Sequence, residues 1–224
     1  MSPAAAIRIR DWFTAGVFHD SADSQTTDQG IACAMAGKVG FEELVQSMKK
    51  AAGSLREAEI QFMLGGGIGC AARGGPETDH DVDFFLRRQD ADHALAVLED
   101  AGFQPERPPE GWLYKAWDGD VFIDLIFSTA DGDVEDEHFE RADELEVYAL
   151  PMLVQSPEDL IVMKLLALDE MALDYKACLE IARSLREQID WGVVRERTKQ
   201  SPYAKAFFTL VEELGIVERA AATS

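Results

Sequence analysis

The sequence contains 224 residues, 47% of them hydrophobic, which is enough apolar material for one large domain or two small ones. Asp and Glu number 42 against 21 Lys and Arg, so the formal net charge is −21. This charge repels polyanions and makes bulk nucleic-acid binding unlikely on physical grounds, whereas a cationic acceptor or a basic protein partner is compatible with it.

The cysteines and the hydropathy indicate a cytoplasmic protein. Cys33, Cys70 and Cys178 lie far apart and form neither a CxxC pair nor a zinc-binding pattern with the histidines. A sparse, odd count of this kind is typical of reduced thiols. No apolar run approaches the roughly 20 residues that a membrane helix requires, and no signal peptide is visible, so we expect no membrane partner.

In chain order, residues 1–38 form a poorly patterned N-terminal arm. A helix is predicted from Phe41, because apolar residues recur at helical spacing. Residues 60–64 alternate as a strand, glycines and a short helix follow, and residues 81–86 alternate as a second strand. A further helix is expected over residues 90–101.

The middle of the chain predicts a loop at residues 105–111 and then a hairpin over residues 113–127. Asp118 and Gly119 are expected to form its two-residue type I′ turn. The acidic stretch 128–146 is interpreted as a solvated loop or short helix.

From Ser156 the pattern becomes helical, with Ser156 as N-cap, Pro157 at the first helical position and Asp159 reaching back as in a capping box. The following residues are apolar nearly all round, which predicts a buried helix. Two more helices are expected near residues 175–185 and after residue 202. The chain therefore divides into a mixed α/β core at 39–150 and a helical C-terminal domain at 151–224.

The glycines after the first strand match the dinucleotide-binding pattern GxGxxA over Gly67–Ala72. In a dinucleotide fold, however, the acidic residue ends the second strand after a full crossover helix. Here only Cys70 to Thr78 is available for a helix, and the aspartates begin the strand, so this interpretation is disfavoured. A glycine turn leading into a helix also exposes backbone N–H groups that can bind phosphate.

Two aspartates interrupt the second strand in a way that predicts a metal site. Asp81 and Asp83 project from one strand face, about 6.6 Å apart along the chain at ~3.3 Å per residue. Carboxylates that close repel each other unless a cation lies between them, and Mg²⁺ prefers such oxygen ligands. Asp124, in the otherwise apolar "VFIDLIF", is the candidate third ligand, which would allow a two-metal site for phosphoryl transfer.

Gly66-Gly67, Gly74 and "DHDVDFFL" resemble the signature of the polymerase-beta-like nucleotidyltransferases. The helical segment "SPEDLIVMKLLA" is similar to that of the minimal prokaryotic members, and the resemblance covers roughly residues 58–190. It implies an α/β (α+β) fold, in which a nucleotidyltransferase core with a small mixed sheet and flanking helices precedes a C-terminal helical bundle, with Mg-NTP in a cleft between them.

The resemblance also implies a role for each motif residue. Gly66 and Gly67 would contact the phosphates of a nucleoside triphosphate (NTP). Asp81 and Asp83 would ligate Mg²⁺, and Asp124 would bind a second metal ion and help to deprotonate a hydroxyl acceptor. The catalytic and metal residues are thus the three aspartates.

Positive charge is scarce in the glycine-to-aspartate segment. Many relatives have a basic residue shortly before the first aspartate, where this chain has Glu77 and Asp79. Lys164 could reach the triphosphate from the helical part, and Arg73 is a second candidate. Alternatively, Lys164 snorkels to the surface or pairs with one of three carboxylates, Asp169, Glu170 or Asp174.

These residues predict a Mg²⁺-dependent enzyme that transfers a nucleoside monophosphate from an NTP to a hydroxyl acceptor and releases pyrophosphate. The acceptor could be a cationic small molecule, a protein or tRNA. Two alternatives stay open: a toxin-type nucleotidyltransferase of a toxin–antitoxin module, acting on tRNA or protein, and a catalytically silent nucleotide- or partner-binding module.

Overall fold

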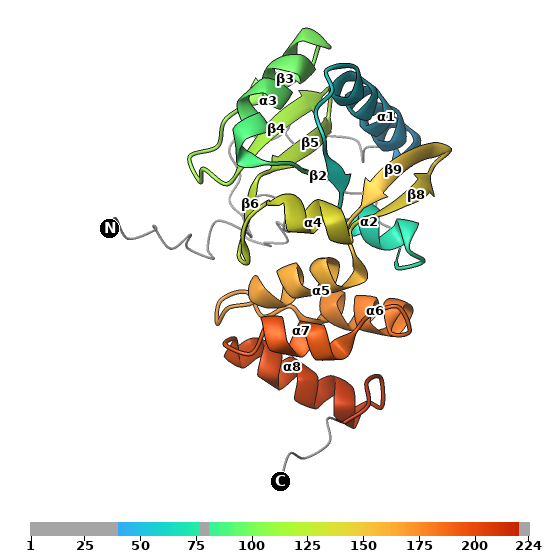
Figure 1. Cartoon of the computed structure of the whole chain (residues 1–224), viewed down its shortest axis with the longest axis vertical. Helices are drawn as coiled ribbons and strands as arrows, with labels where there is room; N and C mark the ends of the chain where they lie inside the picture. Colours follow the sequence, from blue (N-terminus) through green and yellow to red (C-terminus); the bar gives the residue numbers. More distant parts are fainter. Residues whose placement is uncertain (1–39, 77–80, 220–224) are drawn as a thin grey trace, which may run out of the picture.

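Figure 1 shows the computed structural model of the chain, which describes residues 40–76 and 81–219. The arm expected over residues 1–38 lies outside the described residues, as do Glu77 and Asp79. Within the described residues, no helix combines the length and apolar character needed to cross a bilayer.

A seven-stranded mixed sheet in the order β3-β4-β5-β2-β1-β9-β8 forms the core, which confirms the predicted fold class. Among the described strand pairs of this sheet, β2–β5 and β1–β9 are parallel and the others are antiparallel. The strands are β1 (Met63–Leu64), β2 (Val82–Phe85), β3 (Gln104–Glu106), β4 (Leu113–Asp118), β5 (Val121–Ile126), β8 (Asp143–Val147) and β9 (Leu150–Val154), and a separate ribbon contains β6 (Ser128–Thr129) and β7 (Gly132–Asp133).

Helices cover the sheet and form the second part of the molecule, which lies below the sheet in Figure 1. They are α1 (Phe41–Glu57), α2 (Gly66–Ala72), the 3₁₀ turn η2 (Arg88–Asp90), α3 (Ala91–Asp100), α4 (Asp136–Arg141), α5 (Pro157–Leu166), α6 (Tyr175–Leu185), α7 (Trp191–Arg197) and α8 (Pro202–Glu213).

The alternation along β2 separates two faces of the sheet. Val82, Phe84 and Leu86 are buried in the core that α1 and α3 cover. Phe85, on the face of Asp83, packs instead with a smaller cluster that includes Phe139 of α4 and Met163 of α5. The predicted strand therefore directs its aspartate toward the α4–α5 side of the sheet.

The structure corrects the predicted hairpin turn. Asp118 pairs with Val121, so the two loop residues are Gly119 and Asp120 rather than Asp118 and Gly119. Gly119 has a φ of 65°, whereas Asp118 and Asp120 have negative φ. A positive φ at the first loop position alone is typical of a type II′ turn.

Regular structure also extends where loops were expected. Part of the 105–111 loop belongs to the edge strand β3, where Pro105 is tolerated because an edge strand leaves one side unpaired. The acidic stretch 128–146, interpreted as a loop or short helix, contains the short helix α4 and also β6, β7 and most of β8. β9 continues the sheet beyond the boundary placed at residue 150, and α7 lies between the two predicted C-terminal helices.

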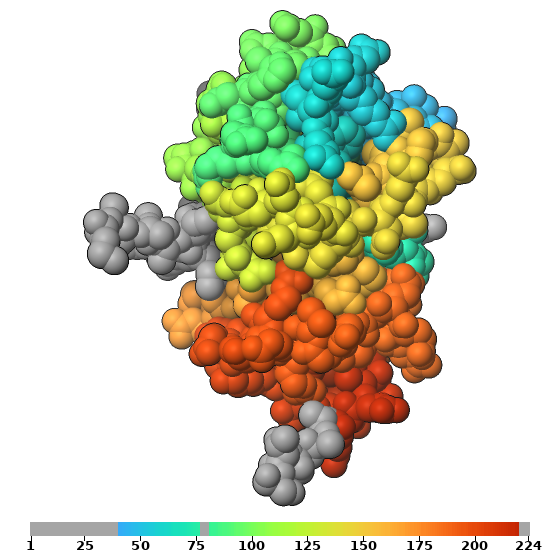
Figure 2. Space-filling model, viewed as in Figure 1, coloured from blue at the N-terminus to red at the C-terminus, as the bar shows by residue number. Residues whose placement is uncertain are grey.

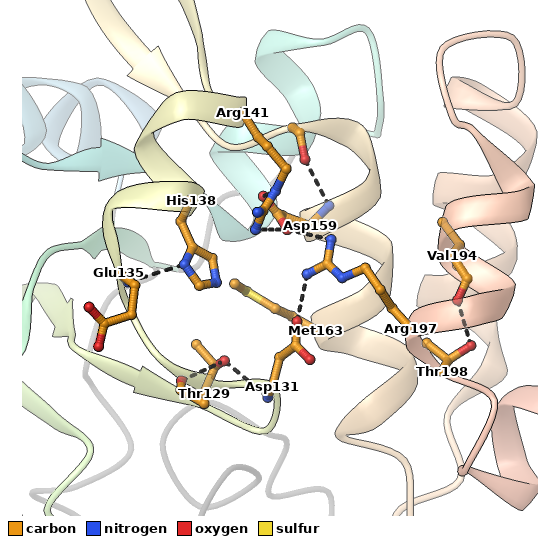
Figure 3. A network of polar contacts seen from close by, with 12 residues as sticks. Thr129, Asp131, Glu135, His138, Arg141, Asp159, Met163, Val194, Arg197 and Thr198 are labelled. Atoms are coloured by element: carbon orange, nitrogen blue, oxygen red, sulfur yellow. Dashed lines mark hydrogen bonds and ion pairs between the residues drawn. The ribbon is translucent and has the colours of Figure 1, made fainter.

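α5 begins as predicted, but Asp159 has a different role. The Ser156 Oγ accepts a hydrogen bond from the Asp159 N–H at 3.0 Å, and Pro157 occupies the first turn. The fully buried Asp159 carboxylate accepts hydrogen bonds from Arg141 of α4 and pairs with Arg197 of α7. Arg197 also pairs with Asp131, which follows β6 (Figure 3).

We call Arg141, Asp159, Arg197 and Asp131 the arginine clamp. It joins the sheet side of the molecule to the helical part, and Figure 2 shows these two parts in contact along the α4 surface. Burial raises the pKa of Asp159, but the hydrogen bond from Arg141 and the charge of Arg197 outweigh it and hold the pKa below its ordinary value.

Asp159→Asn is expected to lower the free energy of unfolding at pH 7 by about 2–3 kcal/mol, because Arg141 loses its anion and Arg197 keeps only Asp131. The cost stays below that of a fully buried pair, since Arg141 is 39% exposed and Arg197 is 20% exposed. A depressed native pKa contributes stability above the unfolded pKa that is lost as pH falls through the native pKa.

The difference in stability between wild type and Asp159→Asn should therefore shrink as pH falls below about 4. Urea unfolding of both proteins between pH 7 and pH 3 measures it. A difference that stays constant over this range would contradict the ionised clamp. Asp190→Asn, at the N-cap of α7, tests whether any polar change near α7 has the same pH profile.

Candidate active site

The parallel pairing of β2 with β5 brings the three predicted aspartates together. Asp83 lies directly opposite Asp124 in the register of the two strands. Asp81, Asp83 and Asp124 each offer one carboxylate oxygen, and these oxygens lie within 4.8 Å of one another. Because paired residues on neighbouring strands point to the same face, residues 41 positions apart in sequence (124 − 83 = 41) form one acidic cluster.

The cluster is electrostatically unfavourable by itself. Burial raises the pKa of Asp83 well above its ordinary value, and the carboxylates of Asp81 and Asp124 raise it further, whereas the ammonium groups of Lys164 and Lys115 oppose the rise. Burial also raises the pKa of Asp124 to about 6, although its ion pair with Lys115 lowers it. Clustered carboxylates with raised pKa values are typical of functional sites and of cation sites.

Lys115 is a charged residue of this site that the sequence reasoning missed. It lies on β4 opposite Asp124, and its Nζ is 2.7 Å from the Asp124 Oδ1. Both side chains are buried. The register continues outward to Glu106 on β3, so Glu106, Lys115, Asp124 and Asp83 form one row across four strands. The row places a positive charge beside the acidic cluster.

The glycine turn approaches this cluster more closely than any side chain would permit. Gly66 has a φ of 54°, and a Cβ added to it would lie 1.6 Å from the Asp83 Oδ2. A Cβ on Gly65 would lie 2.3 Å from the Gln155 Oε1. The Gly65 N–H also donates to the Asp83 carbonyl at 3.0 Å. Glycine at position 66 therefore lets the backbone lie against the Asp83 carboxylate, and glycine at position 65 lets it pass Gln155 and Phe85.

Lys164 and Arg73, the two cations considered from the sequence, have different surroundings. The charge of Lys164, on α5, acts on Asp83 and on Cys70 of α2, so it lies beside the candidate site. Among the described residues, no ion pair joins Lys164 to Asp169, Glu170 or Asp174, the alternative partners considered from the sequence. Arg73 instead donates to the carbonyls of Val154 and Gln155 and pairs with Asp143, and this fixes α2 to the β8–β9 hairpin.

The donor set fits a hard divalent cation. Three carboxylates supply only oxygen ligands, the kind that Mg²⁺ and Mn²⁺ prefer, and two of the three have pKa values raised first by burial and then by neighbouring carboxylates. A bound cation would relieve the repulsion between these carboxylates. Asp81, Asp83 and Asp124 are therefore the residues that would hold the metal.

Comparisons with known proteins bear on the family and the fold. A family model described as "Uncharacterised nucleotidyltransferase" matches residues 42–212. A search of curated proteins found no match.

Solved structures share the fold. The solution structure of the antibiotic-resistance factor ANT(2'')-Ia has a TM-score of 0.52 and 14% identity, and the match covers 79% of this chain and 98% of that chain. A crystal structure of ANT(2'')-Ia in complex with adenylyl-2''-tobramycin has a TM-score of 0.52 and 16% identity, with coverage of 74% and 97%. At these identities the likeness shows a common fold.

Proposed function

Because the chain belongs to a family of uncharacterised nucleotidyltransferases, we propose that it transfers a nucleoside monophosphate from a Mg²⁺-bound NTP to a hydroxyl acceptor. The observation that supports this chemistry best is the convergence of three carboxylates beside a glycine turn. In the reaction, the acceptor oxygen bonds to the α-phosphorus, the bond from that phosphorus to the β-phosphate oxygen breaks, and pyrophosphate leaves.

Each residue of the site has a part in this proposal. Asp81, Asp83 and Asp124 hold Mg²⁺, which when bound neutralises phosphate charge and lowers the pKa of the acceptor hydroxyl. Asp124, opposite Asp83 on β5, would accept the proton of that hydroxyl.

The phosphate contacts come from residues that lie beside Asp83. The backbone of Gly66 and Gly67 and the ammonium of Lys164 bind the triphosphate. Lys164 is suited to this because its charge already acts on Asp83. Together with Lys115, it supplies positive charge that the glycine-to-aspartate segment itself lacks, which weighs against a silent module.

For the acceptor we propose a cationic small molecule that carries hydroxyl groups. The net charge of −21 attracts cations and repels tRNA at long range. The fold neighbour ANT(2'')-Ia was crystallised with adenylyl-2''-tobramycin, which is compatible with this class of acceptor on a common fold. The alternative is a protein or tRNA acceptor, and the following assay distinguishes it from a small-molecule acceptor.

The assay incubates the protein with each α-labelled NTP, Mg²⁺ and one of three acceptors: tobramycin, total tRNA or a protein extract. We expect label on the small molecule only, and none when EDTA removes the metal. Label on tRNA or protein would assign a toxin-type activity instead. Calorimetric binding of an NTP without any labelled product would contradict transfer and favour the silent module.

A further inference from the structure

The Lys115–Asp124 pair is built into the wall of the candidate site. Lys115 is only 9% exposed and its Nζ lies 2.7 Å from the Asp124 Oδ1. The same Nζ lies 4.3 Å from the ring centroid of Phe122, which limits its movement on a second side. A buried lysine without an anion would be costly, so the ammonium and the carboxylate hold each other in place.

The position of Lys115 changes the net charge of the side chains around a bound metal ion. The three carboxylates carry −3 when ionised, and the ammonium groups of Lys115 and Lys164 beside them reduce this to −1. A single divalent cation already exceeds this remainder. A second one beside Asp124 would face an ammonium that already contacts the same carboxylate, and two cations at such a distance repel strongly. The negative charge of a triphosphate would be needed to offset that repulsion.

We propose that Lys115 is a positioning residue that takes the place of a second metal ion at Asp124 in the nucleotide-free protein, so that only one divalent cation binds, through Asp81 and Asp83. This inference rests on the proposed function, since it refines how the same carboxylates are used. It replaces the two-metal expectation for the nucleotide-free protein and leaves a second ion to arrive with the NTP. Lys115 thereby holds the Asp124 carboxylate in place before any ligand binds.

Titration of the nucleotide-free protein with Mn²⁺, followed by the electron paramagnetic resonance of free Mn²⁺, tests the inference. Wild type should bind one equivalent. Lys115→Met, which keeps the side-chain length and removes the charge, should gain a second equivalent or tighten the second site at least about tenfold, because Asp124 is released. Lys115→Arg keeps the charge and should bind one equivalent.

Lys50→Met is the matched control, because Lys50 forms a lysine–aspartate pair with Asp118 at 2.9 Å that does not include the acidic cluster. It should bind Mn²⁺ as wild type does. Asp124→Asn provides a test that needs no change at Lys115: it should also bind one equivalent, since Asp124 holds no metal of its own in the nucleotide-free protein.

Wild-type binding of two equivalents with similar affinity, or of none, would overturn the inference. So would an unchanged single equivalent in a folded Lys115→Met protein. These readouts do not require turnover. Loss of the proposed function would show as absent transfer in the labelling assay, whereas failure of the Lys115 inference would show as a different Mn²⁺ stoichiometry in a protein that still transfers nucleotide.

Discussion

Asp83→Asn is expected to lower the rate of nucleotide transfer by at least about 10³-fold, because the metal-binding charge stabilises the transition state by several kcal/mol. Asp83 is the central ligand of the cluster, since it lies next to Asp81 on β2 and opposite Asp124 on β5. Asparagine keeps the shape of the side chain and removes the charge. Steady-state kinetics with a labelled NTP measures the effect.

The same substitution should leave the metal-free protein at least as stable as wild type. The pKa of Asp83 is raised in the folded protein, so its contribution to stability is present at low pH and is lost as pH rises through the folded pKa. Ionisation of Asp83 therefore opposes folding, and a neutral amide removes that cost. Thermal melts of both proteins without metal check this.

Asp100→Asn, an exposed change at the end of α3, should alter neither activity nor stability. Transfer by Asp83→Asn within tenfold of wild type would contradict the assignment of the acidic cluster as the catalytic site. Equal loss of activity and of folded protein would show instead that Asp83 acts through structure.

Gly66→Ala is expected to lower transfer by at least about 10²-fold, because a displacement of about 1 Å in a reacting group can have an effect of that size. A Cβ at Gly66 would lie 1.6 Å from the Asp83 Oδ2, so the carboxylate must move away. The φ of 54° adds a left-handed conformation that costs alanine about 1–2 kcal/mol. Activity assays and thermal melts of the variant measure the two effects separately.

Gly53→Ala is the matched control. Gly53 lies within α1, and a Cβ there would have no atom within 4 Å, so alanine should be neutral or should stabilise the helix by up to about 1 kcal/mol. If Gly66→Ala transferred nucleotide as fast as Gly53→Ala, the close approach of the glycine turn to Asp83 would have no catalytic importance.

The strand pattern was sufficient to predict the acidic cluster. Asp81 and Asp83 alternate with residues that had to be buried, so their common face followed from the period of a strand. Asp124 was recognisable because a carboxylate in an apolar strand is unusual. Both conclusions depend on local spacing and on one pairing of strands, and the structure brings the three residues together.

Lys115 was missed because a hairpin register depends on which two residues form the loop. With Asp118 and Gly119 as the loop, Asp124 would face Leu113. The observed loop of Gly119 and Asp120 moves the pairing by two residues and places Lys115 opposite Asp124. The choice between these loops rests on the fit of the whole sheet, which local turn propensity does not contain.

The arginine clamp was missed for a similar reason. Asp159 has the position of a capping-box residue, and its partners Arg141 and Arg197 lie 18 and 38 residues away in sequence (159 − 141 = 18; 197 − 159 = 38). The edge strand β8 was not predicted, because acidic side chains are exposed along most of its length and the strand has no continuous apolar face.

The raised pKa values within the acidic cluster link metal binding to folding. Burial and neighbouring carboxylates make the ionised side chains of Asp83 and Asp124 unfavourable in the folded protein. A divalent cation that binds these side chains only in the folded chain would offset that cost, so occupancy of the site and stability of the fold are coupled.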